Sequence, residues 1–255
     1  DIVRLFTAIY YKIAPSATSD FGLPSRRKFL SQIALGIAAI PFSSLLYGMY
    51  QGRYNFKVLN YTLYFDDLPA EFDGYRLAQI SDIHSGSFDN KKKIKYGIDL
   101  INEQQCDTVM FTGDLVNNSA EEMEPWKEVF SSITAKDGVF SVLGNHDYGD
   151  YIHWNTREEK KANLEQLKSV HKEMGWNLLL NEHRFIEKNG QRIASVGVEN
   201  WGAGGFQKNG DLDLAGEGLS VEEFKILISH DPSYWKEKIK IDEKKYHLTL
   251  SGHTH

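Results

Sequence analysis

Short apolar runs that end directly in polar, ligand-type residues recur along the second part of this chain, and they constrain its fold more than any other feature. The runs cover 75–80, 108–111, 138–143, 224–229 and 246–250. Amphipathic or charged segments suited to helices follow the first three runs, at 91–101, 120–133 and 157–174. This alternation is typical of βα units whose strands are buried on both faces, and periodicity alone would suggest a single parallel sheet.

The second half of the chain is richer in predicted strands. Apolar runs at 177–180, 184–188 and 192–198 predict strands, and Asn189-Gly190 between the last two is a strong two-residue hairpin signal. Alternating aromatic and polar residues over 52–65 predict an edge strand ahead of the first βα unit. The glycine-rich loop 202–219 has neither regular glycine spacing nor a following lysine–serine pair, so the sequence gives little support for a phosphate cradle there.

The N-terminal part carries a membrane signal. Residues 31–50 contain no charged side chain, and about twenty such residues match a hydrocarbon core about 30 Å thick. The preceding Ser25-Arg26-Arg27-Lys28-Phe29-Leu30 resembles a twin-arginine export signal, while the apolar patch upstream fits a plain membrane anchor equally well. Basic residues on this side favour a cytoplasmic N-terminal flank, which would place later residues on the non-cytoplasmic side.

The charge and cysteine content of the chain limit the kinds of partner that it can bind. The 255 residues carry a formal net charge of −6, which gives no electrostatic footprint for a nucleic-acid scaffold. Cys106 is the only cysteine and is expected to pack in the interior. The run Lys91-Lys92-Lys93 suits a solvated helix face, with a lipid-headgroup patch as the alternative.

Five clusters of metal-capable or proton-capable residues follow the apolar runs. Loops beyond the carboxyl ends of strands in an α/β sheet converge on one crevice, so residues distant in sequence can meet. Aspartate, asparagine and histidine without thiolate suit manganese, iron, zinc or nickel, and there are about enough ligands for two ions that share a carboxylate. The clusters are Asp82-Ile83-His84, Gly113-Asp114, Gly144-Asn145-His146-Asp147, His230 and Gly252-His253-Thr254-His255.

This ordered set resembles the calcineurin-like metallophosphoesterase superfamily from about residue 75 to the C-terminus. With the membrane segment ahead of it, the chain is similar to the membrane-associated bacterial branch of YkuE-like and YaeI-like phosphoesterases. The resemblance implies a four-layer α/β (α+β) sandwich, in which two mixed β-sheets are flanked by helices and preceded by a membrane-spanning helix. It also implies that family members continue beyond His255.

The resemblance also implies residue roles. Asp82, His84 and His255 would hold the first of two divalent ions, Asp114 would bridge both, and Asn145, His230 and His253 would complete the second. His146 would contact the phosphate and act as an acid toward the leaving oxygen, with Asp147 orienting its ring. A metal-bridging hydroxide would attack a phosphoester.

Purely structural roles are expected for the polar and aromatic candidates outside these metal-ligand assignments. Asp107 and Asp231 suit turns or caps. Tyr148 either packs or lines the substrate mouth. Four histidines outside the motifs are expected at the surface or in packing: His153, His171, His183 and His247.

We therefore expect a juxtamembrane segment (1–24), a transmembrane or twin-arginine-like signal segment (25–50), a linker with an edge strand (51–74) and a C-terminally incomplete catalytic domain (75–255). The expected location is a bacterial inner membrane. The expected activity is dimetal-dependent hydrolysis of a phosphodiester or pyrophosphate bond, in a lipid-linked substrate such as UDP-2,3-diacylglucosamine. The alternatives are a broad phosphomonoesterase, a nucleotide phosphodiesterase or, in another class, a non-catalytic membrane scaffold.

Overall fold

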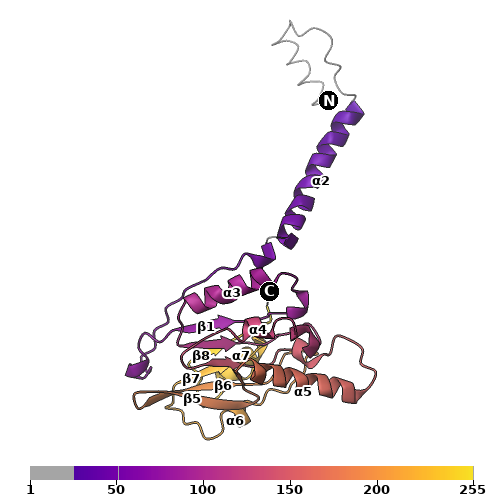
Figure 1. Cartoon of the computed structure of the whole chain (residues 1–255). Helices are drawn as coiled ribbons and strands as arrows, with labels where there is room; N and C mark the ends of the chain where they lie inside the picture. The colour runs from indigo at the N-terminus through magenta and orange to yellow at the C-terminus, as the bar shows by residue number, and fades with distance from the viewer. Residues whose placement is uncertain (1–25, 51, 255) are drawn as a thin grey trace, which may run out of the picture. The chain divides into compact units, whose positions relative to one another are not determined.

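The computed structural model describes residues 26–50 and 52–254, and these fall into two units, divided between Lys57 and Val58. The expected juxtamembrane segment 1–24 and the expected metal ligand His255 lie outside the described residues. In the first unit, helix α2 runs over Arg26–Tyr50 and the short 3-10 helix η1 over Gly52–Tyr54 (Figure 1). Residues Arg26–Met49 are long and apolar enough to cross a membrane, and no residue of the 18-residue apolar window within this helix is buried.

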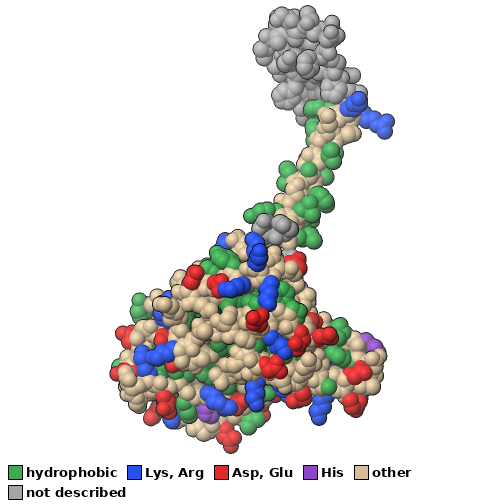
Figure 2. Space-filling model, in the orientation of Figure 1, with side chains coloured by type: hydrophobic (Ala, Val, Ile, Leu, Met, Phe, Trp, Pro, Cys, Tyr) green, Lys and Arg blue, Asp and Glu red, His purple; other side chains and the backbone are tan. Residues whose placement is uncertain are grey.

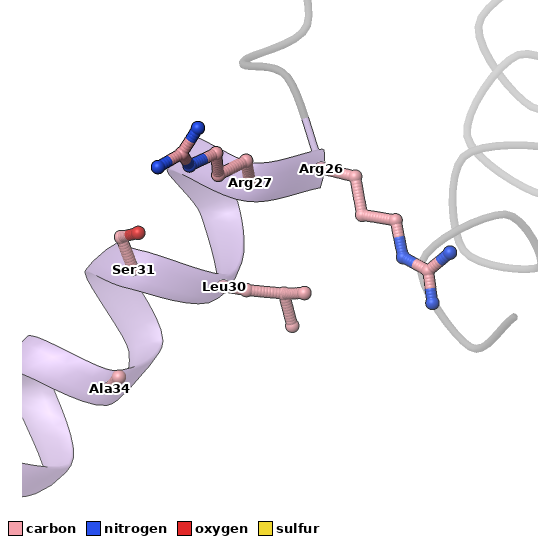
Figure 3. A pocket seen from close by; sticks show the side chains of 5 residues that line it. All are labelled: Arg26, Arg27, Leu30, Ser31 and Ala34. Atoms are coloured by element: carbon pink, nitrogen blue, oxygen red, sulfur yellow. The ribbon is translucent and has the colours of Figure 1, made fainter.

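The charge pattern of α2 fits a membrane span. Apolar side chains cover the helix surface, and basic side chains gather at its N-terminal end (Figure 2). Arg26 and Arg27 extend away from the first turn in different directions (Figure 3). Long basic side chains of this kind keep their charges in the headgroup region while their stems stay apolar. Pro41 lies inside the helix, and such prolines are tolerated in membrane spans.

The second unit contains two four-stranded sheets, which confirms the expected sandwich. The first sheet, in the order β1-β2-β3-β4, is parallel throughout its described strands. In the second sheet, β5 and β6 pair antiparallel, whereas β6, β7 and β8 are parallel, so only this sheet is mixed. The strands are β1 Leu77–Ile80, β2 Thr108–Phe111, β3 Val139–Ser141, β4 Trp176–Leu178, β5 Glu182–Lys188, β6 Gln191–Gly197, β7 Lys225–Ile228 and β8 Leu248–Leu250.

Three apolar layers join the elements. Met110 and Phe140 of the first sheet pack with Ile193 and Ile226 of the second to form the core between the sheets. The outer face of the second sheet packs on α6 and α7. Helix α5 closes the first sheet, and Figure 1 shows α3 and α6 on opposite sides of the strands. The helices are α3 Lys91–Glu103, η4 Ala120–Met123, α4 Lys127–Phe130, α5 Arg157–Glu173, α6 Leu212–Ala215, α7 Ser233–Glu237 and η6 Ile239–Ile241, with short 3-10 turns η2 Ala70–Phe72, η3 Ser85–Ser87 and η5 His146–Tyr148.

The Asn189-Gly190 hairpin is confirmed. Lys188 pairs with Gln191 across the turn. Asn189 and Gly190 have φ angles of 49° and 83°. Positive φ at both central residues is the requirement of a type I′ turn, whose twist matches that of the flanking strands.

Two predicted elements differ in the structure. The expected edge strand over 52–65 is wrong, because this stretch pairs with no strand in the described part of the chain, and Tyr61 and Tyr64 are 81% and 90% exposed. The expected helix over 120–133 is broken into η4 and α4. Pro125 lies between them, and its ring and missing N–H oppose a continuous helix.

The surface carries no single-sign face in the view of Figure 2, where acidic and basic side chains are interspersed over the second unit. Lys91, Lys92 and Lys93 are exposed at the start of α3, and the Lys91 amine lies 3.2 Å from the Glu128 carboxylate. Cys106 is only partly buried, and burial raises the pKa of its thiol.

Candidate metal centre

The five ligand clusters follow strands β1, β2, β3, β7 and β8, so both sheets contribute to one site at their carboxyl ends. Backbone hydrogen bonds join the loops directly. The Asp82 amide donates to the Gly113 carbonyl at 3.0 Å, and the Gly252 amide donates to the His230 carbonyl at 2.9 Å. The convergence predicted from the sequence is therefore present among the described residues.

Asp114 stands at the centre of the site. Its buried carboxylate lies 3.7 Å from Nε2 of His84 and 3.2 Å from Nε2 of His230. Two groups of ligand atoms, each within 4.8 Å of one another, share this carboxylate: His84, Asp114 and His146 form one, and Asp114, His230 and His253 form the other. A carboxylate shared in this way is what a two-ion site requires.

The hydrogen bonds of His230 favour a cation beside it. Its Nδ1 lies 2.8 Å from the Thr112 carbonyl, which can only accept, so Nδ1 carries a proton. Its Nε2 lies 3.0 Å from Oδ1 of Asn145 and 3.2 Å from the Asp114 carboxylate, both acceptors. Burial lowers the pKa of His230, but the hydrogen bond and charge of Asp114 outweigh this and raise it. Either a second ring proton or a cation must therefore balance these converging lone pairs, and the nitrogen and oxygen donor set fits a divalent transition metal.

Asp82 and His253 are tied together. The Asp82 carboxylate accepts the His253 backbone N–H at 3.0 and 3.2 Å and also accepts the Ser81 hydroxyl. Among the described residues Asp82 belongs to neither three-residue ligand group. The implied joint role of Asp82 and His255 in a first ion site lies outside what the described residues cover.

His146 takes its orientation from the backbone. Its Nδ1 donates to the Asn117 carbonyl at 2.8 Å, which leaves Nε2 as the ring nitrogen available to the site. Its backbone N–H donates to Asp114 at 2.9 Å. The ring packs edge-on against His84, with centroids 4.8 Å apart. The structure therefore places a ligand atom of His146 within 4.8 Å of those of His84 and Asp114.

The expected role of Asp147 is wrong. Its fully buried carboxylate accepts backbone N–H groups instead of contacting the ring of His146. The donors are Asp114 at 3.0 Å, Leu115 at 2.8 Å, Val116 at 3.2 Å and Gly144 at 2.8 Å. Burial and the Asp114 charge raise the pKa of Asp147 to about 7, against the lowering by these amides. Asp147 therefore shapes the loop that carries Asp114.

The ligand loops are unusual in their backbone. Four site residues have left-handed conformations, a region that residues other than glycine adopt uncommonly: Asp82 (φ 51°), His84 (φ 47°), Asp114 (φ 60°) and His253 (φ 69°). A Cβ at Gly144 would lie 2.2 Å from the Asp114 carboxylate, so the glycine of this cluster is required by close approach.

The calcineurin-like phosphoesterase family model matches residues 75–255, which is more than half of the chain. The chain belongs to the calcineurin-like phosphoesterases. A second family model, the probable transmembrane domain of calcineurin-like phosphoesterases, matches residues 1–53. Membrane association of this family member is therefore supported by both the match and the apolar helix α2.

Curated relatives of this phosphoesterase come from animals and bacteria. A transmembrane protein with metallophosphoesterase domain from Danio rerio is 26% identical and covers 90% of this chain and 50% of its own length. The uncharacterized metallophosphoesterase YkuE of Bacillus subtilis is 26% identical, and the match covers 91% of this chain and 77% of YkuE. An uncharacterized metallophosphoesterase from Helicobacter pylori is 27% identical, and the match covers 100% of this chain and 64% of that protein. The chain thus spans about half of the first relative and less than two-thirds of the third.

Among solved structures, phosphopantetheinyl hydrolase from Mycobacterium tuberculosis is similar at 16% identity with a TM-score of 0.46, covering 71% of this chain and 83% of its own. The protein TT1561 of Thermus thermophilus is similar at 14% identity with a TM-score of 0.45, and it also covers 71% of this chain and 83% of its own.

Several residues of the phosphoesterase site were missed by sequence reasoning. Asp231 does cap a turn as expected, accepting the Ser233 amide at 2.8 Å, but its other oxygen lies 3.8 Å from Nε2 of His253. The backbone carbonyl of Asn117 accepts the hydrogen bond from Nδ1 of His146, and the ring of Tyr151 stacks on the ring of His146. A backbone carbonyl leaves no signal in residue identity, and a tyrosine in a loop is common, so neither could be found by pattern.

The four histidines outside the motifs lie in packing or at the surface, as expected, and Tyr148 takes the packing alternative. Tyr148 is buried and donates to Glu199 at 3.0 Å, so it packs and does not line a substrate mouth. His171 is buried, His183 bonds the Ala215 carbonyl, and His247 stacks on Phe224. His153 is exposed.

Proposed function

We propose that this chain is the catalytic part of a two-metal phosphoester hydrolase. The observation that carries the proposal is the pair of ligand groups that share the Asp114 carboxylate. Asp82, His84, Asp114 and His255 would hold one ion, and Asp114, Asn145, His230 and His253 the other. Two such ions supply Lewis-acid activation of water and stabilise charge on the attacking and leaving oxygens.

The chain's own residues would complete the reaction. His146 is placed by the bond that its Nδ1–H donates to the Asn117 carbonyl, so Nε2 is the nitrogen turned to the site. In the doubly protonated ring, Nε2–H would give its proton to the leaving oxygen, and the neutral ring with the proton on Nδ1 would remain. Asp147 holds the Asp114 loop through four amides and takes no part in that proton transfer. Gly144 lies so close to Asp114 that a side chain would not fit there, and the next loop residue but one, His146, donates its backbone N–H to the Asp114 carboxylate.

The proposed substrate is a phosphodiester or pyrophosphate, lipid-linked because the site belongs to a chain with a membrane segment. UDP-2,3-diacylglucosamine is one compound of this class. The basic residues in the first turn of α2 favour a catalytic unit on the non-cytoplasmic side of a bacterial inner membrane. A cytoplasmic nucleotide-linked lipid would then lie on the wrong side, so a test needs substrates both with and without nucleotide.

The full chain, purified in detergent and loaded with Mn²⁺, tests the proposal. Turnover would be compared for bis(p-nitrophenyl) phosphate, p-nitrophenyl phosphate and UDP-2,3-diacylglucosamine, with Asp114→Asn as the inactive control. We expect metal-dependent hydrolysis of the diester and little of the monoester. Preference for the monoester would establish the phosphomonoesterase alternative, and no metal-dependent turnover would leave the non-catalytic scaffold.

A further inference from the structure

Tyr151 is an exposed aromatic residue whose position the core does not explain. It is 52% exposed, yet both parts of its side chain make specific contacts with adjacent residues of the site. Its ring stacks on His146 with centroids 4.4 Å apart and planes 30° apart. Its hydroxyl accepts a hydrogen bond from Nδ2 of Asn145 at 2.7 Å.

The contact with Asn145 bears on metal binding. A carboxamide carries its nitrogen and oxygen on opposite sides, so a partner for the nitrogen sets where the oxygen points. With Nδ2 on the Tyr151 hydroxyl, Oδ1 faces Nε2 of His230 at 3.0 Å, beside the Asp114 carboxylate. Tyr151 therefore holds the amide plane in the orientation in which its oxygen is offered to an ion.

The contact with His146 bears on a different step. The Nδ1 bond to Asn117 and the edge contact with His84 fix two sides of the imidazole. The Tyr151 ring covers one face, which limits tilting about the Nδ1 bond. Tyr151 thus touches both neighbours in the cluster, one that would bind metal and one that would move a proton.

The loop that carries Tyr151 is itself held in place. Gly149 adopts a φ of 66°, and its carbonyl accepts the Trp154 indole N–H at 2.7 Å. Asp150 bonds the Lys160 amine from α5 and the Gln207 amide from the opposite loop. Anchoring on both sides of the site gives the tyrosine a fixed place although it is half exposed.

We propose that Tyr151 is a positioning residue that sets the Asn145 carboxamide for metal binding and the His146 ring for proton transfer. The second half rests on the proposed function, whereas the first half concerns metal affinity alone. Removing partners that orient metal ligands typically weakens metal affinity by about 10-fold to 100-fold.

Two variants separate the contacts. Tyr151→Phe removes the hydroxyl and keeps the ring, and Tyr151→Leu removes both. Tyr96→Phe, at a tyrosine on α3 that is 53% exposed, is the matched control. Mn²⁺ binding would be followed by electron paramagnetic resonance of the free ion, and kcat, KM and the pH profile by diester hydrolysis at saturating Mn²⁺.

We expect Tyr151→Phe to weaken one of two Mn²⁺ sites about 10-fold and to lower kcat at saturating Mn²⁺ less than Tyr151→Leu does. Tyr151→Leu should show the same weakening and also a lower kcat with a shifted alkaline limb of the pH profile, because His146 acts in its protonated form. Tyr96→Phe should match the wild type.

Unchanged Mn²⁺ affinity in both Tyr151 variants would overturn the proposal for Asn145, and unchanged kcat and pH profile in Tyr151→Leu would overturn it for His146. A lower Tm with unaltered affinity and pH profile would mean a structural role only and would also overturn it. If the wild type bound two Mn²⁺ ions but hydrolysed none of the substrates, the proposed function would fail while the affinity comparison still decided the role toward Asn145.

Discussion

At Asn145 and His146, two adjacent side chains have different surroundings. Asn145 is buried with its amide between Tyr151 and His230, whereas the ring of His146 is held through Nδ1 by the Asn117 carbonyl. Neighbours in sequence can therefore be altered with separable effects. The same cluster also shows that residue type does not reveal a side chain's partner.

We expect Asn145→Ala to bind fewer Mn²⁺ ions, because one oxygen ligand is removed. We expect His146→Gln to keep both ions and to lower kcat by about 10²-fold to 10⁴-fold, the usual contribution of a positioned proton donor. Metal content of the purified proteins and kcat at saturating Mn²⁺ measure the two effects. Loss of an ion in His146→Gln, with full loading of Asn145→Ala, would reverse the two roles and make His146 a ligand of its group with His84 and Asp114.

Sequence reasoning at this scale found the clusters but not all the contacts within them. The spacing of Asp82, Asp114 and His230 after apolar runs was enough to predict their convergence. The role of Asp147 was wrong because an aspartate beside a histidine can equally bond backbone amides, and the four amides come from residues up to 33 positions away. Tyr151 was missed because its partners are defined by a loop conformation.

At the scale of elements, α5 lies on the first sheet through a buried histidine. His171 packs between Phe111 and Trp176, with Nδ1 3.0 Å from the Ser141 hydroxyl, and its Nε2 has no partner in the described part of the chain. Burial lowers its pKa from 6.5 to about 3. The ring is therefore neutral in the folded protein over a range where it is charged in the unfolded chain.

This interface should lose stability in acid. Between pH 6.5 and about 3 the unfolded chain binds a proton at His171 that the folded protein does not, so stability falls as the pH falls. We expect His171→Leu to reduce the difference in unfolding free energy between pH 7 and pH 5 by about 2 kcal/mol. Denaturant unfolding at the two pH values measures it, with the exposed His153→Gln as control. An equal pH dependence in wild type and His171→Leu would refute the explanation.

Turns and strands were predictable from the sequence where nearby residues alone determine the backbone conformation. The I′ turn at Asn189-Gly190 and the strand 108–111 follow from turn chemistry and apolar content. The edge strand over 52–65 failed because alternation shows that a segment can be extended and says nothing of a neighbouring strand. The two-sheet architecture came from the family resemblance, since a βα pattern alone fits one sheet.

At the scale of the molecule, metal binding should be linked to folding. Ligands from both sheets meet only in the folded chain, so ions that bind the folded state stabilise it. We expect Mn²⁺ at about 100 times its Kd to raise the unfolding free energy by about 2.7 kcal/mol per ion. Thermal unfolding in detergent with Mn²⁺ or with EDTA checks this, and Asp114→Asn should show a much smaller difference. Identical melting of the wild type in Mn²⁺ and EDTA would contradict a metal site at this position.

The left-handed backbone at Asp82, His84, Asp114 and His253 sets stability against activity. Glycine adopts this conformation without a Cβ penalty, so a glycine at one of these positions would relieve roughly 1 kcal/mol of local strain while deleting a proposed metal ligand. Selection for thermostability alone would therefore drift toward a better-folded protein that cannot load metal. Directed evolution of this protein for stability would therefore have to screen for turnover from its first round.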